Sequence, residues 1–417
     1  MLAEVISIGD ELTSGQRLDT NTQWLAERLG ELGVATAYHT TVSDDLAANV
    51  RVFRSAIERA DLVIATGGLG PTADDLTREA VAQTAGVALE LDTASLEHIR
   101  ALFDRRKRVM PEANRVQALF PQGSRIVPNP HGTAPGIDLS VPRPGRNPAR
   151  IFCLPGVPAE MREMWHASVA PAIAVALGPE RQVIRHHRIK CFGVGESDLE
   201  QMLPDLIRRG RDPIVGITVS KATITLRITT AAQSDLACRE KMAPTIATIH
   251  ECLGELVFGE EDDELQHVVC RQLAAAKATV ATREAGTRGL LAWLIGEASA
   301  EWMAPHGQTA LDAAGGAASA FRPFAGGVVV SDTAAGHAVD VGEWAEETRR
   351  QFRADFGLAV GPIGVDDVDI AVASVAGVER LRFARAGHPD IVLPRTAKQA
   401  LNALRLALRR QGEKANR

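Results

Sequence analysis

The chain has 417 residues, of which 45% are hydrophobic and 24% charged, a composition typical of globular proteins that argues against a disordered or fibrous chain. At roughly 150 residues per domain, this length predicts two to four domains. The net charge of −6 gives no sign of non-specific binding to nucleic acid or to a membrane surface.

The spacing of the cysteines and the length of the apolar runs indicate the cellular compartment of the protein. Five cysteines are scattered, and no two are spaced as CxxC, which disfavours a disulfide framework and a structural zinc site. No stretch of about 18 apolar residues occurs, and the first residues show no signal-peptide pattern. We therefore expect a cytoplasmic protein without a membrane span.

The first part of the chain alternates between apolar runs and amphipathic stretches. We expect strands over 3–9, 35–42 and 61–68, helices over 20–33 and 45–60, and further strand-to-loop junctions at 125–137 and 150–161. This alternation predicts parallel strands with helical crossovers. Residues 1–178 should therefore form a three-layer α/β domain with its ligand site at the carboxyl ends of the strands.

The rest of the chain predicts two smaller domains. Residues 179–259 should form an α+β module, and residues 260–417 an α/β domain. In the α+β module we expect a strand, a glycine turn and a helix over 190–203 and an alternating strand over 222–230. In the α/β domain we expect helices over 262–276, 289–300, 343–356 and 395–410, a strand over 326–332, and a loop or tight turn at 313–320.

The most specific motif is TGGLGPTADDLT, residues 66–77, between a predicted strand and a predicted helix. Its glycines let the backbone approach a phosphate and turn N–H groups toward it, and the following helix N-terminus adds partial positive charge. Asp74 and Asp75 would repel a phosphate unless a divalent metal lies between them. Helix capping is the alternative role for both. The glycines are Gly67, Gly68 and Gly70.

Carboxylates also follow the other two predicted strands. Asp10 and Glu11 follow the first, within Gly9–Gly15, and Asp44 follows the second. Because parallel strands end at one edge of a sheet, these side chains should lie near the glycine motif. Solvated loop charges are the alternative for Asp10 and Glu11, and we expect Asp45 to cap the next helix.

Four stretches of the chain resemble the CinA family of competence- and damage-inducible proteins: AEVISIGDELTSGQRLDTNTQWLAERL, TGGLGPTADDLT, HGTAPG and LPGVPAEM. The resemblance runs through about residues 1–175, and the family's first domain is similar to the molybdopterin-binding MoaB/MogA fold. It implies metal-dependent hydrolysis of ADP-ribose to AMP and ribose 5-phosphate. The older interpretation of this fold is binding of molybdopterin, and a non-catalytic binding protein is therefore the alternative.

The resemblance also implies site residues and a divalent metal, Mg²⁺, Mn²⁺ or Co²⁺. The catalytic and metal-binding carboxylates would be Asp10, Glu11, Asp44, Asp74 and Asp75. The ligand-binding positions would be Asn21, Gly67, Gly68, Gly70, Thr72, Asn129, Gly132, Thr133, Ala134, Pro155 and Gly156. Local capping or turn formation is the alternative role for Asn21 and Asn129. For Pro155 and Gly156 the alternative role is to shape the loop.

The middle module resembles the family's small KH-like linker domain at FGVGES, residues 192–197. A KH unit that binds nucleic acid needs a GxxG loop flanked by basic residues, whereas this turn is short and acidic. We therefore expect a structural spacer and no direct contact with nucleic acid. The family also implies a homodimer, and its name suggests a scaffold for a recombination or competence protein.

The third domain departs from its family. Members that deamidate nicotinamide mononucleotide carry an E-S-C/T-T-G-G stretch with a nucleophilic serine, and here Glu284–Gly289 has Ala285 at that position. The family's helper tyrosine is missing from Gly326–Ser331, and Tyr38 is the only tyrosine of the chain. Without a nucleophile, covalent amide hydrolysis fails, so we expect an inactive amidase-like domain in which Thr287 does not replace the serine.

Overall fold

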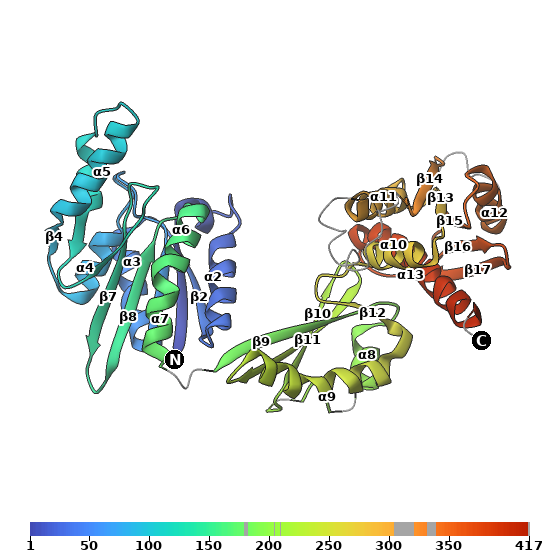
Figure 1. Cartoon of the computed structure of the whole chain (residues 1–417), viewed down its shortest axis with the longest axis horizontal. Coiled ribbons are helices and arrows are strands. Elements are labelled where there is room, and N and C mark those ends of the chain that lie inside the picture. The colour runs from blue at the N-terminus through green and yellow to red at the C-terminus, as the bar shows by residue number, and fades with distance from the viewer. Residues whose placement is uncertain (179–181, 204, 209, 304–320, 332–338, 416–417) are drawn as a thin grey trace, which may run out of the picture. The chain divides into compact units, whose positions relative to one another are not determined.

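The computed structural model describes residues 1–178, 182–203, 205–208, 210–303, 321–331 and 339–415 (Figure 1). The chain divides into two compact units, one made of residues 1–185 and 230–241 and the other of 186–229 and 242–417. The stretch at 313–320 lies outside the described residues. The three domain limits drawn from the sequence stay a prediction. All five cysteines are free.

A six-stranded sheet forms the middle layer of the first unit, in the order β2-β1-β3-β8-β7-β6. The pairings among β2, β1, β3 and β8 are parallel. β7 pairs antiparallel with β8 on one side and with β6 on the other. The strands are β1 (Leu2–Ile8), β2 (Ala35–Val42), β3 (Leu62–Thr66), β6 (Arg125–Val127), β7 (Gly136–Arg143) and β8 (Arg146–Leu154), beside a separate pair of β4 (Leu89–Leu91) and β5 (Leu119–Pro121). The predicted parallel sheet is confirmed, with an antiparallel edge added.

Helices cover both faces of this sheet (Figure 1). They are α1 (Asp10–Thr13), α2 (Thr20–Glu31), α3 (Leu46–Arg59), α4 (Thr77–Ala85), α5 (Thr93–Arg105), α6 (Pro158–Met164) and α7 (Ala170–Leu177). Since successive strand residues face opposite ways, Ile6 and Val63 join the core under α3 and α4, whereas Val5 and Ile64 join the core under α2, α6 and α7. The predicted three-layer fold is confirmed.

The second unit holds a five-stranded sheet, β14-β13-β15-β16-β17, and most of a four-stranded sheet, β10-β11-β9-β12. The strands are β9 (Val183–Cys191), β10 (Ile214–Ser220), β11 (Thr223–Ala232), β12 (Val257–Glu260), β13 (Val280–Glu284), β14 (Phe324–Val329), β15 (Phe356–Ile363), β16 (Asp367–Ser374) and β17 (Gly377–Ala384). The helices of this part of the chain are α8 (Glu196–Met202), α9 (Asp235–Leu253), α10 (Leu265–Ala276), α11 (Leu290–Met303), α12 (Val341–Gln351) and α13 (Pro389–Ala415). Within the described ranges, none of the helices combines the length and the apolarity that a bilayer crossing needs.

One predicted helix of this unit is too long. The expected helix over 343–356 ends at Gln351, and Phe356 already begins β15. The chain leaves the helix because Arg353 adopts a left-handed φ of 52°, which stops the helical repeat. The last part of the predicted helix is therefore a turn and the start of a buried strand.

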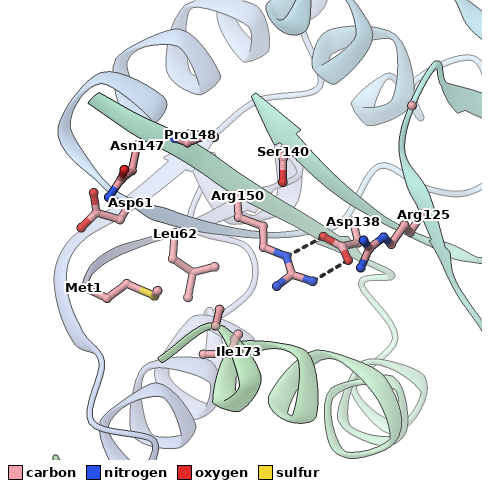
Figure 2. Close-up of a pocket in the computed structure, with 12 residues that line it drawn as sticks. Met1, Asp61, Leu62, Arg125, Asp138, Ser140, Asn147, Pro148, Arg150 and Ile173 are labelled. Atoms are coloured by element: carbon pink, nitrogen blue, oxygen red, sulfur yellow. Dashed lines mark hydrogen bonds and ion pairs between the residues drawn. The ribbon is translucent and has the colours of Figure 1, made fainter. Parts of the chain in front are cut away.

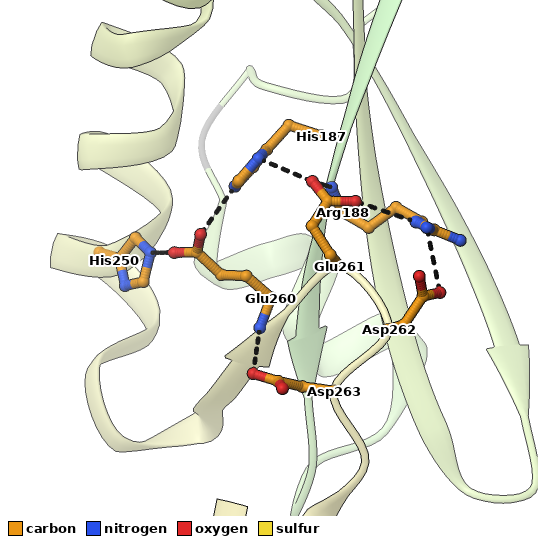
Figure 3. A network of polar contacts seen from close by, with 7 residues as sticks. All are labelled: His187, Arg188, His250, Glu260, Glu261, Asp262 and Asp263. Atoms are coloured by element: carbon orange, nitrogen blue, oxygen red, sulfur yellow. Dashed lines mark hydrogen bonds and ion pairs between the residues drawn. The ribbon is translucent and has the colours of Figure 1, made fainter. Parts of the chain in front are cut away.

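The two adjacent histidines of β9 contact different groups, as their alternation along a strand predicts. His186 Nδ1 lies 2.8 Å from Thr229 Oγ1. The ring nitrogens of His187 lie 3.1 Å from a Glu260 carboxylate oxygen and 3.0 Å from one of Glu261, and His250 Nε2 lies 3.0 Å from the same Glu260 carboxylate (Figure 3). This network joins β9, β12 and α9.

A buried ion pair fixes the amino-terminal half of the first sheet. Glu4 in β1 is fully buried and accepts from Arg59 Nε at 2.8 Å and Nη2 at 2.6 Å, while its Oε1 also accepts from Thr40 at 2.7 Å. The Arg59 side chain is 40% exposed and stacks over Tyr38 at 4.0 Å. β1, β2 and α3 are therefore tied together by one carboxylate.

We expect Arg59→Met to lower the free energy of unfolding by about 2 kcal/mol, because it leaves the Glu4 carboxylate buried without its cation. Urea denaturation at neutral pH measures this loss. Arg54→Met on the exposed side of the same helix is the matched control. Equal losses in the two variants would show that water replaces Arg59.

Candidate functional site

Four loops that follow the parallel strands meet at one edge of the six-stranded sheet. The strand order reverses direction between β1 and β3, and such a reversal leaves a crevice at the carboxyl ends of the strands. A cavity of about 610 Å³ occupies this edge. Its lining includes Glu11 and Arg17 after β1, Asp44 after β2, Gly67, Gly68, Gly70, Asp74 and Asp75 after β3, Gln117, Thr133, Ala134, and Pro155, Gly156 and Glu160 after β8.

The glycine loop has the backbone of an anion cradle. Gly67 and Gly68 have φ values of 106° and 63°, and a Cβ on Gly67 would lie 2.3 Å from the carbonyl oxygen of Ile8. In the part of the chain that the structure describes, the N–H groups of Gly68 and Leu69 have no hydrogen-bond acceptor. Successive N–H groups beside a left-handed residue form a concave site for an anion.

The Asp75 carboxylate stabilises the glycine loop and does not cap the helix that follows it. Its carboxylate accepts from the N–H of Gly70 at 2.7 Å, from the N–H of Thr72 at 2.9 Å and from the Thr72 hydroxyl. A Cβ on Gly70 would lie 2.3 Å from this carboxylate. α4 begins at Thr77 with Leu76 at its N-cap position, so the helix-capping alternative for Asp74 and Asp75 is wrong.

Asp10 and Asp44 bind each other's backbone. The N–H of Asp10 donates to Asp44 Oδ2 at 2.8 Å, and the N–H of Asp44 donates to Asp10 Oδ1 at 3.1 Å. Burial raises the pKa of Asp44, and the charges of Asp10, Asp74 and Glu11 raise it further, against the lowering effect of the Asp10 N–H. The Thr72 hydroxyl lowers the pKa of Asp74. The cavity therefore concentrates negative charge around Asp44.

These carboxylates suit a cation that is shared with a ligand. Among the described residues, no three His, Cys, Asp or Glu side chains are grouped as a ready-made metal site. Mg²⁺ needs no such group, because it binds through one or two carboxylates together with phosphate oxygens of the substrate. Asp10 and Asp44 each keep one carboxylate oxygen outside their reciprocal bonds, which fits that arrangement.

The two predicted asparagines organise the surrounding loops. Asn21 on α2 donates to the carbonyl of Gly156 at 2.9 Å and to the Thr66 hydroxyl at 3.3 Å, so it joins three elements beside the cavity. Asn129 accepts from the N–H of Gly132 at 2.9 Å and donates to Glu160 at 2.7 Å. Asn129 thus forms the turn expected as its alternative, and that turn presents Thr133 and Ala134 to the cavity.

Three polar side chains of the lining were not predicted: those of Arg17, Gln117 and Glu160. Arg17 is the basic residue of the lining, and it has no ion pair within the described ranges. Gln117 donates to the carbonyl of Leu69 at 3.3 Å. Glu160 lies inside the LPGVPAEM stretch, directly after a predicted strand. Its position in the sequence could therefore have identified it as a residue of the site. Gln117 comes from a 3₁₀ turn far along the chain, which no local pattern connects to the loop.

A second cavity of the first unit, about 720 Å³, lies beside α7 and the start of β3 (Figure 2). Its central arginine, Arg150, forms two hydrogen bonds of 2.7 Å with the Asp138 carboxylate. Asp61 and Leu62 place this cavity at the amino end of β3. Because open parallel sheets bind ligands at the opposite end, the cavity at the glycine loop is the stronger candidate.

Comparison with known proteins agrees with this geometry. Residues 4–175 match the family model of a probable molybdopterin binding domain, and residues 186–259 match the damage-inducible protein CinA KH domain. A putative competence-damage inducible protein of Symbiobacterium thermophilum is 41% identical over 298 residues, covering 70% of this chain and 68% of that protein. A putative competence-damage inducible protein of Acetivibrio thermocellus is 33% identical over 422 aligned positions, covering 97% of this chain and 98% of that protein. The chain belongs to the CinA family.

A solved structure from the CinA family gives a further comparison. The crystal structure of CinA from Thermoplasma acidophilum, described as a protein with unknown function, is 32% identical, covers 41% of this chain and 98% of that chain, and has a TM-score of 0.37. The predicted KH-like module is confirmed by the CinA KH match. The predicted MoaB/MogA-like first domain is confirmed by the molybdopterin-binding match.

The Glu284–Gly289 stretch leads into α11, and its side chains are packed against the start of that helix. Glu284 is buried at the end of β13 and accepts from the N–H groups of Leu291 at 3.0 Å and Ala292 at 2.8 Å. Thr287 is fully buried, and its hydroxyl donates to the same carboxylate. Ala285 is 1% exposed. The Thr287 hydroxyl therefore lies in the interior, out of contact with solvent.

We expect Asp44→Asn to raise the melting temperature at about pH 7 and to lose this advantage at about pH 4. The folded pKa of Asp44 is raised, so the ionised carboxylate costs stability above that pKa, and the cost disappears as falling pH protonates it. The side-chain carbonyl oxygen of the new asparagine can still accept the hydrogen bond from the Asp10 N–H. Thermal scans at both pH values measure the change, with Asp104→Asn as the exposed control. Lower stability at both pH values would show that the hydrogen bond outweighs the repulsion.

Proposed function

We propose that the first unit hydrolyses the pyrophosphate of a nucleotide, with ADP-ribose as the leading substrate and AMP and ribose 5-phosphate as products. The observation that carries this proposal is the meeting of a phosphate-type backbone loop and the acidic cluster in one cavity. The free N–H groups of Gly68 and Leu69 suit an anion. The carboxylates beside them suit a divalent cation, Mg²⁺, Mn²⁺ or Co²⁺.

Each group of the cavity then has a distinct task. Gly68 and Leu69 would donate their N–H groups to oxygens of one phosphoryl group, and the unpaired Arg17 guanidinium would bind oxygens of the other. Asp44 in the cavity lining and Asp10, which is bonded to it, would hold the cation. A bound cation would supply polarisation of a phosphoryl oxygen and a lowered pKa for a water. Water oxygen forms the new bond to phosphorus as the bridging P–O bond breaks, and the departing phosphate takes the bridging oxygen.

A carboxylate outside the cation pair must orient the water and accept its proton. Asp74 and Glu11 both line the cavity, and the Thr72 hydroxyl lowers the pKa of Asp74, so Asp74 is ionised at neutral pH. Asp75 has a different task in this scheme, because it holds the loop through Gly70 and Thr72. Its substitution would distort the cradle itself.

Binding without turnover is the second candidate function. The description of the matching family model as a probable molybdopterin binding domain favours it. A nucleotide or molybdopterin would then occupy the same loop through its phosphate. In either case we propose a cytoplasmic homodimer, with a recombination or competence protein as a further partner.

We expect ADP-ribose to yield AMP when the full chain is incubated with Mg²⁺, Mn²⁺ or Co²⁺, and no AMP when the metal is chelated. Asp74→Asn should lower kcat by about a hundredfold or more, because it removes a group that acts on the reacting water. Product release followed by chromatography measures both effects. Asp104→Asn, an exposed change on α5, should leave the rate unchanged.

One outcome would count against hydrolysis, and another would count only against the role of Asp74. Saturable binding of ADP-ribose with no AMP at any metal concentration would move the first unit to the binding function. An undiminished rate in Asp74→Asn would remove Asp74 from the reaction and leave Glu11 as the proton acceptor.

For the third domain we propose loss of deamidase activity and a structural role, since Ala285 offers no nucleophile and Thr287 is fully buried. Nicotinamide mononucleotide should remain unchanged after incubation with the full chain, as measured by the release of ammonia. Ammonia release above the level of a heat-denatured control would contradict this assignment.

A further inference from the structure

Arg78 is a buried cation directly behind the glycine loop. It is the second residue of α4 and is 4% exposed. Its Nη1 donates to the carbonyl of Leu69 at 2.9 Å. Its Nε and Nη2 are buried with no hydrogen-bond partner within the described ranges. Most of the hydrogen-bonding capacity of this guanidinium is therefore unused by the fold.

Three features make this arrangement costly for stability. A buried charge loses its hydration, and no carboxylate forms an ion pair with Arg78 in the described part of the chain. The residue also lies in the first turn of a helix, where the partial positive charge of the helix disfavours a cation. Unsatisfied buried N–H groups add a further penalty.

The neighbours of Arg78 do not relieve this cost. Burial lowers the pKa of Arg78 to about 10, and the Asp75 charge only partly offsets this effect. The carboxylate of Asp75 accepts from Gly70 and Thr72 instead. Burial raises the pKa of Cys153 to about 12, so its thiol is neutral at physiological pH. Arg78 therefore remains a positive charge at physiological pH that its surroundings compensate only in part.

We propose that Arg78 is the positioning residue of the anion cradle, a buried cation that attracts the ligand phosphate through the Gly67–Gly70 loop. Its bond to Leu69 holds that carbonyl behind the loop and leaves the N–H groups of Gly68 and Leu69 on the ligand side. Its charge acts across a region from which water is excluded, where electrostatic attraction is stronger than in solvent. This inference rests on the anion site of the proposed function.

The fold provides a way to separate this role from a structural one. Gln117 also donates to the carbonyl of Leu69, at 3.3 Å, so this carbonyl keeps a partner when Arg78 is replaced. Replacing a poorly paired buried charge by an apolar side chain of similar length is often neutral or stabilising. Arg78→Met should therefore weaken anion binding without lowering thermal stability.

The experiment measures binding to the full chain by calorimetry together with the melting temperature. Inorganic pyrophosphate is titrated at constant Mg²⁺, and ADP-ribose is titrated with the metal chelated, where no turnover is expected. We expect Arg78→Met to bind pyrophosphate about tenfold more weakly or worse, with an unchanged or higher melting temperature. Arg78→Lys keeps the charge and should recover part of the affinity. Arg54→Met, an exposed arginine of the same unit, should bind as the wild type does.

Each contrary result has its own meaning. Wild-type affinity in Arg78→Met overturns the proposal for Arg78 and leaves the hydrolase untouched. A fall in melting temperature or unfolding in Arg78→Met makes Arg78 a structural residue and also overturns the proposal. A wild-type chain that binds neither probe overturns the anion site altogether. Tight binding that depends on Arg78 but yields no AMP supports the proposal and rejects hydrolysis.

Discussion

The parallel pairing of β1 with β2 and β3, and of β3 with β8, is the constraint on which the site depends. Parallel strands deliver all of their following loops to one edge, so residues more than a hundred positions apart line one cavity. The Glu4 carboxylate secures the far end of this pairing by joining β1, β2 and α3. The position of the cavity thus follows from backbone topology before any of its side chains is considered.

The charged residues of its lining determine which ligands the cavity can bind. Its lining has five carboxylates, Glu11, Asp44, Asp74, Asp75 and Glu160, but one arginine. An anionic ligand could not enter such a lining without backbone donors and an added cation. The loop N–H groups and the buried guanidinium behind them supply positive potential from the backbone side. The site therefore combines opposing charges, which the proposed anionic ligand and cation would balance together.

Much of the first unit could be predicted because its signals are local. Apolar runs, helical spacing and the glycine motif lie within short windows, and they located β1, β3, α2 and α3 to within a few residues. The capping role of Asp45 was also visible, and its carboxylate accepts from the N–H of Ala48 at 2.7 Å. The glycine loop was correctly placed after a strand because both of its neighbours have strong patterns.

The features that were missed depend on contacts between distant residues. The part that Asp75 plays in folding the loop was missed, because its sequence position does not reveal that Gly70 and Thr72 donate to its carboxylate. Gln117 reaches Leu69 across 48 positions. The strands β16 and β17 pair as a hairpin, whose register no composition pattern specified. Tertiary pairing, rather than local propensity, decides such features.

The reciprocal bonds between Asp10 and Asp44 have a consequence for the energetics of ligand entry. Each residue's backbone N–H is anchored by the other's carboxylate, so the loops after β1 and β2 become ordered together when the chain folds. A cation of the kind proposed would meet oxygens whose conformational entropy has already been lost. The repulsion between the two carboxylates remains as strain in these loops, and a positive charge between them would relieve it.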